Sequence, residues 1–249
     1  MSKYIKISFR SIIVILICLC TIHSSSAGNK CSIPVLVYHR IGYNSNALTV
    51  TPERLFLDLT KLKQNGYETI SLKTFEEYLL GKEIQMPAKP ILITFDDSYQ
   101  DNYNYAFPIL KQNNCIATFF VITGFIDKYS DRLTAQQIKE MYTSGMNFGS
   151  HTVSHAALSE ESQDLVWNEL FYSKQTLEKT LGIEIDAIAY PAGCYNSETI
   201  RIATGLGYSR GFTVRPGICK QEDPPFVIPR IPIFSYTKDV LDAIDNIQM

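Results

Sequence analysis

Residues 91–97 read Ile-Leu-Ile-Thr-Phe-Asp-Asp, an apolar run that ends in two adjacent carboxylates. The run predicts a short strand over 91–95, and the polar turn after it leads into a helix over 102–112. Strand-like and helix-like segments alternate in the same way on both sides of this stretch. Such alternation predicts a parallel sheet covered by helices. With about seven strands, the expected fold class is α/β, as a distorted (β/α) barrel.

The boundaries of the other elements follow from local signals. Pro52 stands at a tolerated first helical position, and the leucines after it recur at spacings of four and three until Gly66. Thr134 and Gln137 have the pattern of a capping box, which begins another helix. Further helices are expected over 72–80, 163–181, 197–206 and 240–247, and further strands over 34–38, 67–70, 117–121, 146–150, 187–190, 208–214 and 228–233.

Polar or turn residues follow the C-terminal ends of four predicted strands. They are His39, the pair Asp96 and Asp97, His151, and Pro191. In α/β barrels the chemistry is carried by the face at the C-terminal ends of the strands. We therefore expect these five residues, which are distant in the sequence, to meet at one rim.

The first 27 residues are typical of an export signal. Three basic residues precede an apolar stretch over 12–22, and Ser25-Ser26-Ala27 offers small residues for cleavage. The stretch is shorter than the roughly 20 apolar residues that span a bilayer. We expect an exported protein, in the periplasm, at the cell surface or outside the cell, with no stable membrane span after cleavage. An uncleaved N-terminal anchor is the alternative.

Composition favours one well-buried domain over 28–249 and excludes some partners. The chain has a formal net charge of −2, so nothing indicates binding to nucleic acid. Four cysteines follow the predicted signal, and an exported protein can oxidise them. They allow three pairings, of which Cys194 with Cys219 is the first to test, and free buried thiols are the alternative. The remaining two are Cys31 and Cys115.

The candidate metal ligands are Asp97, His151 and His155. The two histidines are four residues apart, so one helical turn or a tight loop can bring both imidazoles to one cation. Two imidazoles and a carboxylate hold a divalent ion and leave coordination positions open, as catalysis requires. Taken separately, the acid pair also fits a solvated turn, and the histidine pair fits ordinary surface residues.

The motifs resemble those of the polysaccharide deacetylases (NodB-homology, carbohydrate esterase family four). Thr94–Tyr99 is similar to their Thr-Phe-Asp-Asp-Gly-Tyr motif, and Ser150–His155 to their Ser-His-Thr-x-x-His motif. Tyr190–Asn196 resembles their Pro-Tyr-Gly segment more weakly. The segment Pro34–His39 resembles the biofilm-type poly-N-acetylglucosamine deacetylases. The resemblance implies a single domain whose family core covers about 89–249.

The resemblance also implies a role for each matching residue. Asp97, His151 and His155 would hold one divalent metal ion, with Zn²⁺ as the default and Co²⁺, Ni²⁺ or Fe²⁺ as alternatives. Asp96 would be the general base that takes a proton from the attacking water, and His39 the general acid that protonates the departing amine. The backbone near Ala192 would stabilise the oxyanion, and Tyr190 and Arg230 would contact the substrate or its surroundings.

Three positions depart from the family pattern. Ser98 replaces a glycine, Ala192 replaces an aromatic residue, and Ala189 stands where many members have an arginine that orients the base. Arg230 either approaches Asp96 from the last strand or lies on the surface. The implied function is an exported metal-dependent hydrolase that removes N-acetyl groups from N-acetylglucosamine-containing polysaccharide and releases acetate. The rivals are a catalytically impaired carbohydrate-binding or export-accessory protein on the same fold, and a different barrel metalloenzyme.

Overall fold

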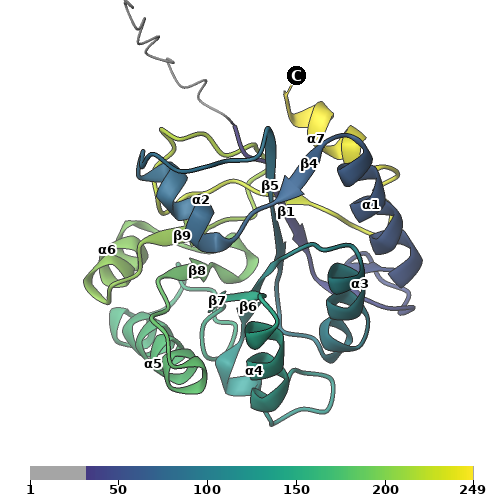
Figure 1. Ribbon diagram of the computed structural model, residues 1–249. Helices are drawn as coiled ribbons and strands as arrows, with labels where there is room; N and C mark the ends of the chain where they lie inside the picture. The colour runs from purple at the N-terminus through teal and green to yellow at the C-terminus, as the bar shows by residue number, and fades with distance from the viewer. Residues whose placement is uncertain (1–31, 249) are drawn as a thin grey trace, which may run out of the picture.

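The computed structural model describes residues 32–248 and has the predicted α/β barrel architecture (Figure 1). Seven parallel strands form the path β10-β1-β5-β6-β7-β8-β9. The predicted signal segment and Cys31 lie outside the described residues. The strands on this path are β1 (Val35–Tyr38), β5 (Lys89–Phe95), β6 (Thr118–Val121), β7 (Asn147–Ser150), β8 (Ala187–Ala189), β9 (Arg210–Phe212) and β10 (Ile231–Pro232).

The two edges of this sheet meet through the segment that precedes β10. Ile228 forms a parallel bridge with Phe212 of β9, and its N–H donates to the carbonyl of Gly211 at 2.9 Å. A few residues later, Ile231 pairs with Leu36 of β1. One stretch of chain therefore bonds to both edges, and the sheet curls into the distorted barrel that the sequence predicted.

The helices lie around the outside of the strands (Figure 1). Thr134 and Gln137 form the predicted capping box. At other helix ends, Thr51 accepts from the N–H of Arg54 at 3.2 Å, and Gly182 ends a helix with φ of 70°. The helices are α1 (Pro52–Gln64), α2 (Leu72–Leu79), α3 (Phe107–Gln112), α4 (Ala135–Thr143), α5 (Gln163–Leu181), α6 (Ser197–Gly205) and α7 (Val240–Gln248).

The sequence did not predict three features: the π- and 3₁₀-helical turns, a short parallel pair after β1, and the pairing of the strand Tyr67–Thr69 with β5 alone. The expected helix over 102–112 begins as a π-helix, η1 (Asn102–Ala106), and two single 3₁₀ turns, η2 (Thr123–Phe125) and η3 (Pro191–Gly193), follow strand ends. A short parallel pair, β2 (Arg40–Ile41) with β3 (Thr49–Val50), follows β1. The predicted strand over 67–70 is β4 (Tyr67–Thr69), which pairs only with β5.

Aromatic side chains form a continuous layer across four neighbouring strands. Tyr38, Phe95, Phe119 and Phe148 stand opposite one another in the sheet register. Their ring centroids are 5.5, 4.9 and 5.8 Å apart in that order. Because successive residues of a strand point to opposite faces, the neighbours Asp96 and Phe95 face different sides of the sheet.

A second apolar cluster fills the other face of the sheet. It contains Leu92 of β5, Phe120 of β6 and Phe212 of β9, and Phe75 of α2 packs against it with its ring 5.9 Å from Phe212. Arg230 lies over the ring of Phe120, with its guanidinium carbon 5.7 Å from the centroid. The interior is thus apolar between Arg230 and the N-terminal ends of the strands, where α2 contributes the side chain of Phe75.

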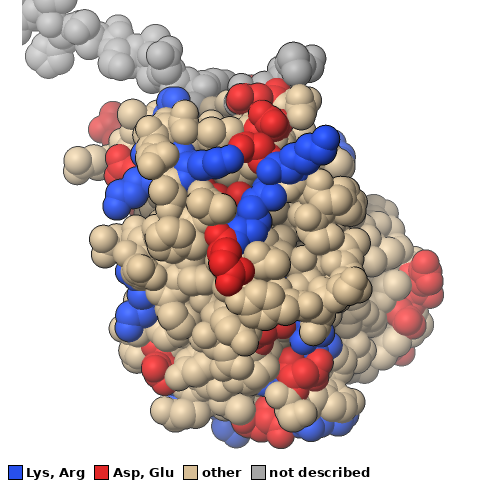
Figure 2. Space-filling model, turned by 90° about the vertical axis from the view of Figure 1, so that its right-hand side faces the viewer, with Lys and Arg blue, Asp and Glu red and all other residues tan. Residues whose placement is uncertain are grey.

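The surface carries charges of both signs. Figure 2 shows one face on which Lys and Arg side chains are interleaved with Asp and Glu, with broad uncharged areas around them. Among the ion pairs of the molecule are Lys61 with Asp239 and Arg54 with Asp58. Across residues 32–248, no helix combines the length and the apolar character that crossing a bilayer requires.

The described cysteines are unpaired, which overturns the suggested pairing of Cys194 with Cys219. Both are free thiols, as is Cys115. Cys219 is completely buried and bonds through its backbone to Ile33, whereas Cys194 is partly exposed in the turn after β8.

Candidate active site

The C-terminal ends of the strands carry the predicted site residues. His39 follows β1, the pair Asp96 and Asp97 follows β5, His151 follows β7, and η3 follows β8. All of these strands are parallel, so their ends lie at one edge of the barrel. The structure thereby brings Asp97, His151 and His155 together, and places Asp96 and His39 beside them.

The cluster of Asp97, His151 and His155 has the donor geometry of a metal site. The Oδ1 atom of Asp97 is 3.4 Å from Nε2 of His151 and 3.3 Å from Nε2 of His155. The three donor atoms lie within 4.8 Å of one another. Nδ1 of His151 is 2.8 Å from the carbonyl oxygen of Ala189 and donates to it, which leaves the Nε2 lone pair directed at the cluster.

The electrostatics of the cluster fit a cation. Burial alone would raise the pKa of Asp97, but hydrogen bonds from His151 and His155 hold that pKa far below its ordinary range. Burial likewise opposes the protonation of His151, yet Asp96 and Asp97 raise its pKa above the usual value. The carboxylate of Asp97 is therefore ionised at the point where two imidazoles converge. His155 is 38% exposed, so one side of the cluster is open to solvent.

The backbone at the cluster adopts conformations that non-glycine residues rarely take. The φ angles are 72° at Asp97 and 51° at Ser98, and both Thr152 and His155 have φ of 66°. Each such residue costs of order 1 kcal/mol, and such residues gather at functional sites. Ser98 thus occupies a position that favours the family's glycine. Its hydroxyl accepts a long hydrogen bond, 3.4 Å, from the N–H of Ile122.

Asp96 is bound bidentately by Arg230. The two nitrogens Nη1 and Nη2 lie 2.8 and 2.7 Å from the two carboxylate oxygens. Arg230 is 0% exposed, and its Nε donates to the carbonyl of Thr213 at 2.8 Å. Burial raises the pKa of Asp96, but Arg230, together with His151 and His39, more than offsets burial and holds the pKa below the ordinary value. Arg230 therefore contacts the acid rather than a substrate, and it is not on the surface.

His39 and the two residues after it are bound by Asn102 and Asp101, a few positions after the acid pair. The amide of Asn102 donates to the carbonyl oxygen of His39 at 2.8 Å. Asp101 accepts from Nε of Arg40 at 2.8 Å and from the N–H of Ile41 at 3.2 Å. Within residues 32–248, the buried Nδ1 of His39 has no hydrogen-bond partner. Burial lowers the pKa of His39, although Asp96 and Asp97 partly counter this.

The turn after β8 contains two residues that were expected near the substrate, and the structure places one at the surface and buries the other. Ala192 is exposed, with φ of 52°. Tyr190 is 0% exposed, its ring stacks on Tyr195 at 4.7 Å, and its hydroxyl points at Gly211. A side-chain contact between Tyr190 and substrate was therefore a wrong expectation, because the packing of the barrel wall encloses the ring.

Sequence reasoning missed residues that support the site from other elements. Glu169 of α5 accepts hydrogen bonds from the loop between His151 and His155. Tyr99 lies beneath two guanidinium groups, with Arg40 at 4.2 Å and Arg132 at 4.1 Å from its ring centroid. The available signal for Glu169 was its position within the buried stripe of α5, where a charged residue needs a partner.

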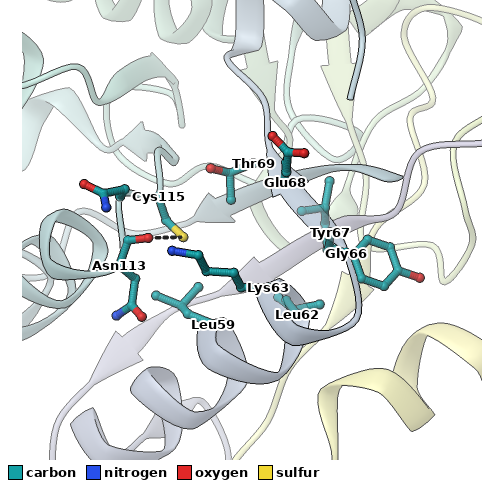
Figure 3. A pocket seen from close by; sticks show the side chains of 11 residues that line it. Leu59, Leu62, Lys63, Gly66, Tyr67, Glu68, Thr69, Asn113 and Cys115 are labelled. Carbon is teal, nitrogen blue, oxygen red and sulfur yellow. Dashed lines mark hydrogen bonds between the residues drawn. The ribbon is translucent and has the colours of Figure 1, made fainter. Parts of the chain in front are cut away.

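Two cavities of the described residues lie at the opposite end of the strands. The cavity in Figure 3, about 400 Å³, is lined among others by Lys63, Thr69 and Cys115, near the starts of β4 and β6. Another, of about 620 Å³, is lined by Glu76, Asp186 and their neighbours. None of the residues that line these two cavities belongs to the cluster at the C-terminal rim.

Comparison with known proteins identifies one family. A family model described as polysaccharide deacetylase matches residues 83–211. The chain is 33% identical to YxkH of Bacillus subtilis, classed as a polysaccharide deacetylase, over 80% of this chain and 70% of that protein. It is 30% identical to the poly-beta-1,6-N-acetyl-D-glucosamine N-deacetylase of Staphylococcus epidermidis, over 74% of this chain and 67% of that protein.

Solved structures agree as well. The Streptococcus pyogenes deacetylase PplD, in complex with acetate, superposes with a TM-score of 0.82 at 35% identity, over 88% of this chain and 99% of PplD. IcaB from Ammonifex degensii superposes with a TM-score of 0.77 at 28% identity, over 88% of this chain and 96% of IcaB. The chain belongs to the polysaccharide deacetylase family, the hydrolases that the motifs at 94–99 and 150–155 indicated.

Proposed function

We propose that this chain is an exported, metal-dependent N-deacetylase of N-acetylglucosamine-containing polysaccharide. The observation that carries the proposal is the meeting of an ionised, buried Asp96 with the donor cluster of Asp97, His151 and His155 at one rim. A base and a cation site side by side are what hydrolysis of an unreactive amide needs.

Asp96 is the proposed general base. Its carboxylate is fixed in orientation by the two hydrogen bonds from Arg230, and its lowered pKa keeps it ionised. It takes a proton from the water that attacks the acetyl carbon. Arg230 supplies the guanidinium that the family pattern places at position 189, which supports catalysis over the accessory role.

Asp97, His151 and His155 would hold the cation. When bound there, a divalent ion acts as a Lewis acid that acidifies water and polarises the amide carbonyl. Two imidazoles and one carboxylate suit Zn²⁺, and they also accept Co²⁺, Ni²⁺ or Fe²⁺.

His39 is the proposed general acid. In the reaction the bond between the acetyl carbon and the sugar nitrogen breaks, a carbon–oxygen bond to the attacking water forms, and acetate leaves. The nitrogen departs well only as a protonated amine, and His39 delivers that proton from beside Asp96. The exposed N–H of Ala192 is available to donate to the carbonyl oxygen as its negative charge develops.

The proposed glycan substrate and the proposed export of the protein are supported by different observations. The relatives from Staphylococcus are named as N-deacetylases of poly-beta-1,6-N-acetyl-D-glucosamine, which favours a glycan rich in N-acetylglucosamine. The basic and apolar pattern of residues 1–27 supports export. An N-acetylated glycan of the cell envelope is therefore the proposed partner, with no role for nucleic acid.

The test measures acetate release from a panel of N-acetylated glycans, with and without chelator. We expect the Zn²⁺-loaded wild type to act on a poly-N-acetylglucosamine and to lose activity when the ion is removed. Asp96→Asn, which keeps the shape but removes the base, is expected to lower kcat by about 10²–10⁴-fold. Asp164→Asn, at the exposed start of α5, is the matched control. If metal-replete wild type releases no acetate from any glycan, the accessory role prevails.

A further inference from the structure

The loop that joins the two candidate histidine ligands has no helix or strand of its own. Residues 151–155 must nevertheless present both imidazoles to one point, with φ of 66° at Thr152 and again at His155. A segment with two such residues does not hold this shape by its own preferences. Its conformation therefore depends on what it is bonded to on either side.

One side of the loop is bonded to η2. The N–H groups of Thr123 and Gly124 donate to the carbonyls of Thr152 and Val153 at 3.0 and 2.8 Å. A Cβ atom on Gly124 would lie 2.6 Å from the carbonyl oxygen of Val153, so no larger residue fits without moving the loop. These bonds satisfy two carbonyls of the loop. The N–H of His151 donates to the carbonyl of Val121, and those of Thr152 and His155 donate to nearby hydroxyls, so the N–H groups of Val153 and Ser154 remain.

The other side of the loop is bonded to Glu169. Oε2 of this glutamate accepts from the N–H groups of Val153 and Ser154, both at 2.8 Å, and Oε1 accepts from the hydroxyl of Ser154 at 2.7 Å. Glu169 is 6% exposed. Four residues along α5, Ser173 bonds to Ser150 at 2.7 Å, directly before His151. One helix therefore grips the loop at its start and at its middle.

We propose that Glu169 is a positioning residue of the metal centre. It touches no reacting atom and no ligand side chain. Its carboxylate holds the two N–H groups between the ligands, so that both imidazoles converge before the ion arrives. Without it, ordering the loop becomes part of the cost of binding, and metal affinity falls. This role rests on the proposed metal dependence. Outer groups that orient metal ligands typically contribute 10–100-fold to affinity.

The experiment measures the Zn²⁺ dissociation constant of the purified metal-free protein by competition with a chromophoric chelator. Glu169→Ala is expected to weaken binding by about 10–100-fold. Glu169→Gln is expected to stay close to wild type, because its amide oxygen accepts both backbone N–H groups and its NH₂ group donates to Ser154. The absorption spectrum of the Co²⁺-loaded protein provides a second readout, since a displaced ligand changes it.

Glu178→Ala is the matched control on the same helix. Glu178 accepts from the N–H of Ile185 at 3.1 Å and pairs with Lys174, far from the loop. It is expected to lower Tm without changing Zn²⁺ affinity. If Glu169→Ala does not fold, Glu169→Asp replaces it, since the shorter side chain pulls on the loop.

The outcomes separate this inference from the proposed function. Wild-type affinity in folded Glu169→Ala, or in its Asp substitute, overturns the inference, as does an equal loss in the alanine and glutamine variants. A wild-type protein that binds no Zn²⁺ instead removes the metal dependence on which the inference rests.

Discussion

Two carboxylates, one buried and one half-buried, stand at opposite ends of the same barrel, each near an arginine, and their pKa values shift in opposite directions. Asp96, at the C-terminal end, receives two hydrogen bonds from Arg230, and its pKa is lowered. Glu76, on α2 at the N-terminal end, has its pKa raised to about 8, chiefly by burial and by the nearby Asp186. Arg210 lowers the pKa of Glu76, but by less than burial and Asp186 raise it.

The difference lies in how each guanidinium is used. Arg230 directs both terminal nitrogens at one carboxylate, whereas Nη1 of Arg210 donates to the carbonyl of Ser209 and its Nε has no partner within the described residues. Oε1 of Glu76 is also buried without a partner. The bidentate pair with Arg230, helped by His151 and His39, lowers the pKa of Asp96 despite burial. Arg210 does not offset the effects of burial and Asp186 on the pKa of Glu76.

The largest expected effect comes from breaking the pair at the C-terminal end. Arg230→Gln leaves Asp96 buried without its counter-charge, which should cost about 3–5 kcal/mol of unfolding free energy and raise the pKa of Asp96. Urea unfolding measures the loss. Arg210→Gln is the matched change at the other end and should cost clearly less, because it breaks no bidentate pair. Equal losses in the two variants would contradict the comparison.

An intermediate effect is expected at Glu76. Its pKa rises from 4.5 to about 8 on folding, so the folded state binds the proton more tightly. Stability therefore falls as pH rises from about 4.5 to about 8. Glu76→Gln should be nearly neutral at pH 5 and should stabilise the protein by about 1–3 kcal/mol at pH 9, because glutamine removes the ionisation.

Unfolding experiments at three pH values test this prediction. Glu77→Gln, at the next position and paired with Lys82, is the control for removing a carboxylate from α2. A stabilisation of Glu76→Gln that stays the same from pH 5 to pH 9 would show that the glutamate is not held protonated.

The smallest effect is expected from backbone strain, which also differs between the ends. Of the seven non-glycine residues with positive φ in the described chain, Asp97, Ser98, Thr152, His155 and Ala192 lie at the C-terminal rim. Ser98→Gly should stabilise the protein by about 0.5 kcal/mol, since relief of strain slightly exceeds the entropy cost of glycine.

Asn114→Gly, at the N-terminal end with φ of 54°, is the matched control. It should gain less, because asparagine tolerates this conformation better than serine does. Chemical unfolding of both variants decides the matter. A loss of stability in Ser98→Gly would show that the hydroxyl's bond to Ile122 outweighs the strain.

The elements were predictable because their signals are local. Pro52 begins α1 and Thr134 caps α4 as the sequence indicated, and the apolar run at 91–95 lies within β5. The π-helical start at Asn102 was not foreseen, since helical periodicity does not distinguish a wider first turn.

The sequence predicted which residues lie at the ends of the strands, but it did not predict which of them bond to one another. The partners Arg230 and Asp96 are 134 positions apart, and no local pattern states which residue of the last strand faces the acid. The sequence therefore left two alternatives open for Arg230, which were contact with Asp96 and a position on the surface. Glu169 was missed for the same reason, because its role depends on how α5 packs against the loop.

The order in which the barrel is assembled has a consequence for incomplete chains. The three candidate metal donors are all present once residue 155 has been synthesised, but the guanidinium that orients Asp96 arrives only with the strand that closes the sheet. A polypeptide truncated before residue 230 would carry the three candidate donors but would leave the carboxylate of Asp96 without its bidentate partner.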